Sequence, residues 1–189
     1  MHVINIISIV AYFLLLIVCA YTDYKRGKIY NKYLISFLLF FALIHCILYI
    51  VLLANGSKDV ELLNVKLKDS GIGFLIGFVI GFIFYVLGVF KGGDAKLLAV
   101  VGLQVGGSGI LYHYSTIMVI AGIGALYVLI KNKAFVRSFK RVFLYIKGIF
   151  LTASFNKYTS EEDDKIKFPF AVYILIGEMV AYINYIIRG

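Results

Sequence analysis

The sequence predicts an all-α, polytopic membrane protein, and its composition, its long apolar runs and the position of its charges all indicate this class. Of the 189 residues, 62% are hydrophobic and only 15% are charged, and the mean hydropathy is +0.94. Soluble domains are only about half apolar. The composition therefore excludes a water-soluble globule, and the same excess of apolar residues excludes a disordered chain.

A helix needs about 20 apolar residues to cross a hydrocarbon layer of roughly 30 Å. Runs of this kind predict about six transmembrane helices in a single membrane-embedded domain, residues 1–189. The expected spans are 3–21, 33–54, 71–90, 97–111, 114–130 and 168–187.

The first two spans are continuous apolar runs, and a short basic segment separates them. Cys19 and Cys46 lie inside these runs without a CxxC spacing, so they are interpreted as packing residues and not as metal ligands or a disulfide. The third span carries Gly73, Gly77 and Gly81 at every fourth position. Small residues at this spacing predict close approach of another helix.

The fourth and fifth spans are short, and the fourth is the less regular of the two. It contains Gln104 and the run Gly106-Gly107-Ser108-Gly109. We therefore expect a broken or strongly tilted helix there, supported by its neighbours. The sixth span is of full length, and the segment 131–167 before it alternates bulky apolar residues with Lys and Arg. This alternation predicts a cytoplasmic, interfacial amphipathic helix, followed by a solvated acidic patch at 161–164.

The net charge of +9 comes from 19 Lys and Arg against 10 Asp and Glu. Fifteen of the cations follow the first, third and fifth spans, and four lie on the other side of the predicted membrane. This asymmetry predicts that the N-terminus is outside and that the fifteen face the cytoplasm. Cations beside apolar runs favour anionic lipid headgroups as their partners, and we expect no nucleic acid partner.

Carboxylates close to the hydrocarbon are costly, so they are the first candidates for a functional site. Asp23 ends the first span, Asp94 follows the third, and Glu178 lies in the middle of the sixth. The predicted topology places Asp23 and Asp94 on the same side. Two carboxylates in one partly dry site share a proton, so one activates water while the other polarises a carbonyl and protonates the leaving amine.

Each of these residues also has a structural interpretation. Asp94 precedes the helical run that starts at Ala95 and is a candidate N-cap, with Gly92 and Gly93 forming the turn before it. Asp23 is a candidate solvated residue that balances the neighbouring cations. Glu178 is open to three interpretations: a proton relay, a hydrogen-bonded structural group or a modulator of the site.

The segments around the two aspartates resemble the type IV prepilin and preflagellin peptidases, which are aspartic membrane proteases of the GxGD type. In the first segment, Asp23, Lys25, Ile29 and Asn31 match the pattern of an Asp followed by basic residues and Ile-Pro-Asn. In the second, Gly93, Asp94 and Lys96 match Gly-x-Gly-Asp-x-Lys, with Gly92 beside them. The resemblance extends to a closing Pro-Phe…Gly pattern at Pro169, Phe170 and Gly177.

The chain departs from that pattern at three positions. Tyr30 replaces the usual Pro, Lys91 stands where the first Gly is expected, and Glu178 follows the last Gly where small or apolar residues are usual. Neither aspartate is lost. The chain also lacks the CxxC pairs that accompany the N-methyltransferase domain of larger members, so it resembles the short, peptidase-only form.

The resemblance implies an aspartic endopeptidase of the plasma membrane. Its substrate would be the short basic leader of a pilin-like or archaellin-like precursor, cut near the cytoplasmic face. Asp23 and Asp94 would be catalytic, Lys25, Ile29, Asn31, Gly92, Gly93 and Lys96 would position them, and no metal or cofactor would be required.

Two other classes of function remain compatible with the residues alone. A small proton- or ion-coupled transporter or channel would use Asp23, Asp94 and Glu178 as a relay, with the fourth span as its broken helix. An internal repeat would favour this alternative, but residues 1–90 and 91–189 show no convincing similarity. A non-catalytic assembly partner would require both aspartates to be dispensable.

Overall fold

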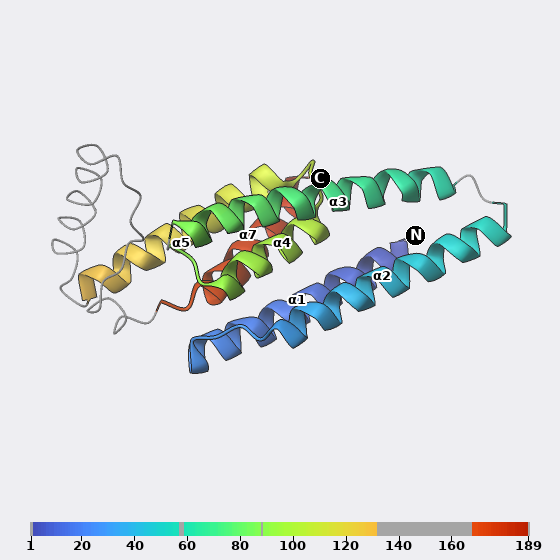
Figure 1. The fold of residues 1–189 in the computed structure, drawn as a ribbon. Helices are drawn as coiled ribbons and strands as arrows, with labels where there is room; N and C mark the ends of the chain where they lie inside the picture. The colour runs from blue at the N-terminus through green and yellow to red at the C-terminus, as the bar shows by residue number, and fades with distance from the viewer. Residues whose placement is uncertain (1, 57–58, 88, 132–167, 189) are drawn as a thin grey trace, which may run out of the picture.

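The computed structural model describes residues 2–56, 59–87, 89–131 and 168–188, which form six α-helices and no strand (Figure 1). The helices are α1 (His2–Arg26), α2 (Asn31–Ala54), α3 (Asp59–Val86), α4 (Gly92–Val105), α5 (Ile110–Lys131) and α7 (Phe170–Arg188). The predicted all-α class is confirmed. The expected amphipathic segment and acidic patch fall within 132–167 and lie outside the described residues.

Four of these helices are long and apolar enough to cross a membrane: α1 from Ile6 to Arg26, α2, α3 and α5. A shorter apolar stretch, Phe170–Asn184, lies in α7. The chain is therefore a polytopic membrane protein. Helix α1 continues past the expected end at position 21 to Arg26, and α3 begins at Asp59 instead of 71 and ends at Val86 instead of 90.

The fourth helix is shorter than the bilayer and lies earlier in the chain than the predicted span at 97–111. It has 14 residues, which gives a length of about 21 Å. Gly106, at φ 82°, ends the helix and donates its N–H to the carbonyl of Gly102. The expected turn at Gly92 and Gly93 is wrong, because both glycines are the first residues of α4 and neither has a positive φ.

Helices α3 and α4 run antiparallel at very close range. The buried glycine positions of α3 face successive parts of α4: Gly81 lies against Ala95, Gly77 against Leu98, and Gly73 against Gly102. A Cβ atom on Gly81 would lie 2.6 Å from the carbonyl oxygen of Ala95, closer than van der Waals contact allows. The predicted close approach of another helix at this glycine stripe is confirmed.

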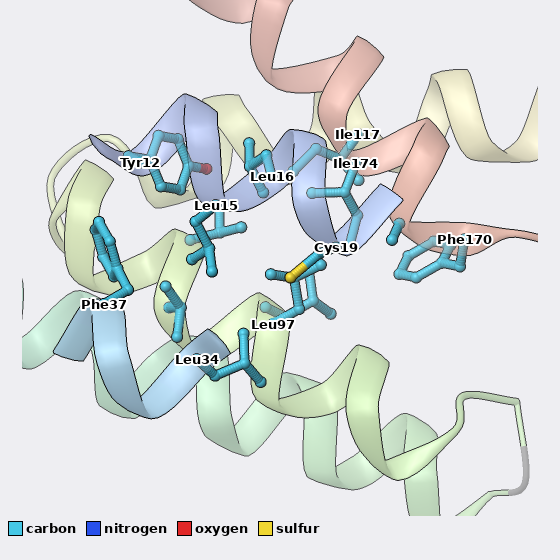
Figure 2. Packing of buried hydrophobic residues seen from close by; sticks show 14 of the residues in the cluster. Tyr12, Leu15, Leu16, Cys19, Leu34, Phe37, Leu97, Ile117, Phe170 and Ile174 are labelled. Carbon is cyan, nitrogen blue, oxygen red and sulfur yellow. The ribbon is translucent and has the colours of Figure 1, made fainter. Parts of the chain in front are cut away.

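The buried core lies where the two N-terminal helices meet α4, α5 and α7. Figure 2 shows Leu16 of α1, Leu34 of α2, Leu97 of α4, Ile117 of α5 and Ile174 of α7 in one cluster. Many large apolar side chains on the outer faces of the helices are exposed, as expected for helices in contact with lipid. The core thus fixes one end of α1 against the beginnings of α4 and α7.

Candidate functional site

The two aspartates of the sequence motifs lie at the same end of the helix bundle. Asp23 is in the last turn of α1 and Asp94 is in the first turn of α4. They come from separate helices, and the negative charge of Asp23 acts on the carboxyl group of Asp94. Both side chains are buried, with 5% and 6% of their surface exposed.

Contacts between the two motifs hold these helix ends together. Asn31, at the start of α2, accepts a hydrogen bond of 3.1 Å from the Nζ atom of Lys96 in α4. Ile29 lies against Gly93, where a Cβ atom would stand 2.9 Å from that of Ile29. A larger residue at position 93 would therefore push the two segments apart. Four predicted motif residues thus form two contacts, Asn31 with Lys96 and Ile29 with Gly93, between segments that are far apart in the sequence.

The carboxylate of Asp23 is held by the beginning of α7. The backbone N–H of Ala171 donates to its Oδ2 atom at 3.1 Å. This N–H belongs to the first turn of α7, where backbone donors lack a partner within the helix and the helix dipole favours a negative charge. Sequence reasoning missed Ala171. The only available signal was the Pro169-Phe170 pair that marks the start of this helix.

Asp94 is the third residue of α4. The prediction that it is the N-cap of this helix is therefore wrong. Lys91 is the N-cap, and its backbone N–H donates to the Oδ2 atom of Asp94 at 3.1 Å. The pKa of Asp94 is raised to about 6, chiefly by burial. The charge of Asp23 contributes to this increase, whereas the Lys91 N–H and the Lys91 ammonium oppose it. Asp94 therefore holds a proton at a pH at which an exposed aspartate has lost it.

A cavity of about 390 Å³ opens beside Asp23. The end of α1 and the segment before α7 form most of its wall, and the full lining is Asp23, Tyr24, Lys25, Gly27, Lys91, Phe168 and Pro169. Asp94 is not among the lining residues and is buried. The cavity offers space for a polar ligand or a peptide segment next to one of the two carboxylates.

The other predicted residues make contacts of their own. Lys25 lines the cavity beside Asp23, and its Nζ atom donates to the hydroxyl of Tyr21 at 2.6 Å. Glu178 is fully buried in α7, where both of its carboxylate oxygens lie 3.1 Å from the Nδ1 atom of His113. Sequence reasoning did not identify His113 as this partner. Tyr12 is also close enough to Glu178 for electrostatic interaction.

Fold and site together define a class, namely a polytopic helical membrane protein with two buried, electrostatically coupled carboxylates at one end of the bundle. Residues 10–130 match the model of the type IV leader peptidase family, and the chain belongs to this family. The matched range includes Asp23 and Asp94 but not Glu178. Searches of curated proteins and of solved structures found no match to the chain.

Membership in the family makes the chain a membrane protease of the prepilin peptidase type. It also implies that the substrates are pilin-like precursors. The membrane-spanning helices agree with this class.

Proposed function

We propose that the chain is an aspartic endopeptidase that removes the short basic leader from pilin-like or archaellin-like precursors at the cytoplasmic face of the plasma membrane. Asp23 and Asp94 share one proton and hydrolyse the scissile peptide bond together. The observation that carries the proposal is a pair of buried, electrostatically coupled carboxylates from separate helices, one of which, Asp23, lines a cavity.

The raised pKa of Asp94 supports a division of roles within this pair. Asp94 keeps the shared proton and polarises the substrate carbonyl, while the ionised Asp23 in the cavity wall accepts a proton from the attacking water. The water oxygen forms the new bond to the carbonyl carbon. When the C–N bond breaks, a carboxyl proton passes to the leaving amine, and the pair returns to its singly protonated state.

The membrane context supports a precursor as the substrate. The proposed site lies at the ends of apolar helices, where the apolar helix of a precursor reaches it from within the bilayer while its leader stays in water. Lys25, Arg26, Lys28 and Lys32 surround this end of α1 and α2. The excess of cations supports a cytoplasmic location, since cytoplasmic loops are enriched in Lys and Arg.

The test is cleavage of a leader-bearing precursor by the full chain in lipid vesicles, followed by mass spectrometry of the products. We expect Asp23→Asn and Asp94→Asn each to abolish cleavage without loss of folding, because an amide keeps the shape of the side chain but cannot exchange the proton. Near-normal cleavage by either variant removes that residue from the pair.

Asp69→Asn is the matched control. Asp69 is another helical aspartate, but it binds the N–H and hydroxyl of Ser108 in the loop between α4 and α5. Its replacement is expected to leave cleavage in place. Loss of cleavage in all three variants alike would indicate general damage to the fold and would contradict the assignment of the pair.

A further inference from the structure

Lys91 contacts both of the segments that carry the proposed catalytic aspartates. Its backbone N–H donates to the Oδ2 atom of Asp94 at 3.1 Å. Its Nζ atom donates to the carbonyl oxygen of Gly27 at 3.3 Å, and Gly27 is the residue that ends α1 with φ 62° four positions after Asp23. One residue therefore joins the turn after α1 to the start of α4.

The charge of Lys91 also faces the aspartate pair. Its side chain lines the cavity next to Asp23, and its ammonium acts electrostatically on both carboxylates. Among the described residues, the other titratable side chains in the cavity wall are Tyr24 and Lys25 of α1, and Lys25 donates a hydrogen bond to Tyr21. The described residues before α7 that line the cavity are the uncharged Phe168 and Pro169.

Position 91 is where the resembled motif has a glycine, which has neither the charge nor the reach of a lysine. We infer that Lys91 is a positioning residue of this peptidase: it ties the turn after α1 to α4 and holds a fixed positive charge beside the aspartate pair. The inference rests on the proposed function of Asp23 and Asp94. The consequence is that Lys91 helps to set the pH range in which the pair works.

The test is the pH dependence of precursor cleavage by the full chain in vesicles. Lys91→Met keeps the length of the side chain but removes its charge. Without the ammonium, the ionised form of Asp94 is less favoured, so the pH above which cleavage is lost should rise by roughly half a unit, as expected for charges separated by partly hydrated protein. Lys91→Arg keeps the charge and should restore the wild-type profile.

Lys28→Met is the matched control for the loss of one cation. Lys28 lies in the same turn after α1, and its charge acts on Tyr30 instead. We expect its pH profile to match that of the wild type. A shift of equal size in Lys28→Met would mean that only the overall charge of this end matters, which would overturn the inference.

An unchanged profile in Lys91→Met would also overturn it, and Asp94→Asn in the same experiment separates the two claims. If Asp94→Asn is inactive while Lys91→Met keeps the wild-type profile, only the role of Lys91 fails. If Asp94→Asn is active, the proposed function itself fails. Should Lys91→Met not fold, Lys91→Gly decides in the same way, since it keeps the backbone N–H that binds Asp94.

Discussion

Loss of the proton from Asp94 should limit the rate of the proposed cleavage as the pH rises. Burial and the neighbouring charge of Asp23 together raise its pKa to about 6. The acid form is present below this pH and is lost as the pH rises through it. We therefore expect kcat for precursor cleavage to fall with a midpoint near pH 6, measured from initial rates in vesicles between pH 4 and 9.

The raised pKa of Asp94 also makes the stability of the folded protein decrease as the pH rises. The folded protein binds the Asp94 proton more tightly than the unfolded chain, so this residue makes folding less favourable as the pH rises from about 4 to about 6.

For the cleavage reaction, a rate that increases steadily through pH 6 and stays high up to pH 8 would contradict the assignment of Asp94 as the proton donor.

Glu178 is the other residue whose role can be tested by substitution. It is fully buried and pairs with His113, which joins α7 to α5. We expect Glu178→Gln to keep a hydrogen bond to His113 and to leave the pH profile of cleavage unchanged. Glu178→Leu leaves His113 without this partner, and we expect it to lower stability by about 1–3 kcal/mol, measured by thermal unfolding in detergent.

The double variant Glu178→Leu with His113→Phe serves as the control, because an apolar pair of similar volume can replace a buried ion pair. It should recover part of the lost stability. If Glu178→Gln folds normally but cannot cleave, Glu178 is essential to the reaction, and neither the structural nor the modulating role is correct.

At the scale of helices, the sequence was most informative where the signal is local. Apolar runs predict membrane helices because hydropathy depends on neighbouring residues, and the spacing of Gly73, Gly77 and Gly81 predicts the close contact with α4. The ends of helices were less predictable. Helix α3 begins in a polar stretch that contains Lys66 and Asp69, which gave no apolar signal.

The contacts within the candidate site were likewise harder to predict from the sequence than its aspartates. The predicted topology placed Asp23 and Asp94 on the same side, and the resemblance to a peptidase family named Asn31 and Lys96 as positioning residues without predicting the hydrogen bond between them. It did not predict that the Ala171 N–H binds Asp23 or that Lys91 reaches Gly27. These contacts involve backbone atoms of segments far apart in the chain, and no pattern of side chains encodes them. They depend on how the end of α1 and the beginnings of α4 and α7 are placed next to one another.

At the scale of the whole molecule, a shared cytoplasmic site requires that the turn after α1 and the start of α4 both face the cytoplasm. Single cysteines introduced by Lys28→Cys and Lys91→Cys, in a chain with Cys19 and Cys46 replaced, test this with a membrane-impermeant maleimide. We expect both to be labelled from the cytoplasmic side. Asn55→Cys, in the turn after α2, should be labelled from the opposite side.

Labelling of positions 28 and 91 from opposite sides would rule out a shared site, because two carboxylates on opposite faces of a membrane cannot act on one peptide bond. Labelling of both from outside would keep the pair but reverse the proposed orientation. The labelling pattern therefore tests the position of the site independently of its chemistry.

The central claim is that Asp23 and Asp94 act as one catalytic unit, and the most direct measurement is kcat for precursor cleavage in Asp23→Asn, Asp94→Asn and the double variant. General acid–base groups contribute on the order of 10² to 10⁴ in rate. We expect a loss of this size in each single variant and no further loss in the double variant, because the effects of groups that act as a unit are not additive. A double variant in which the two losses multiply, or a single variant that keeps the wild-type kcat, would contradict this claim.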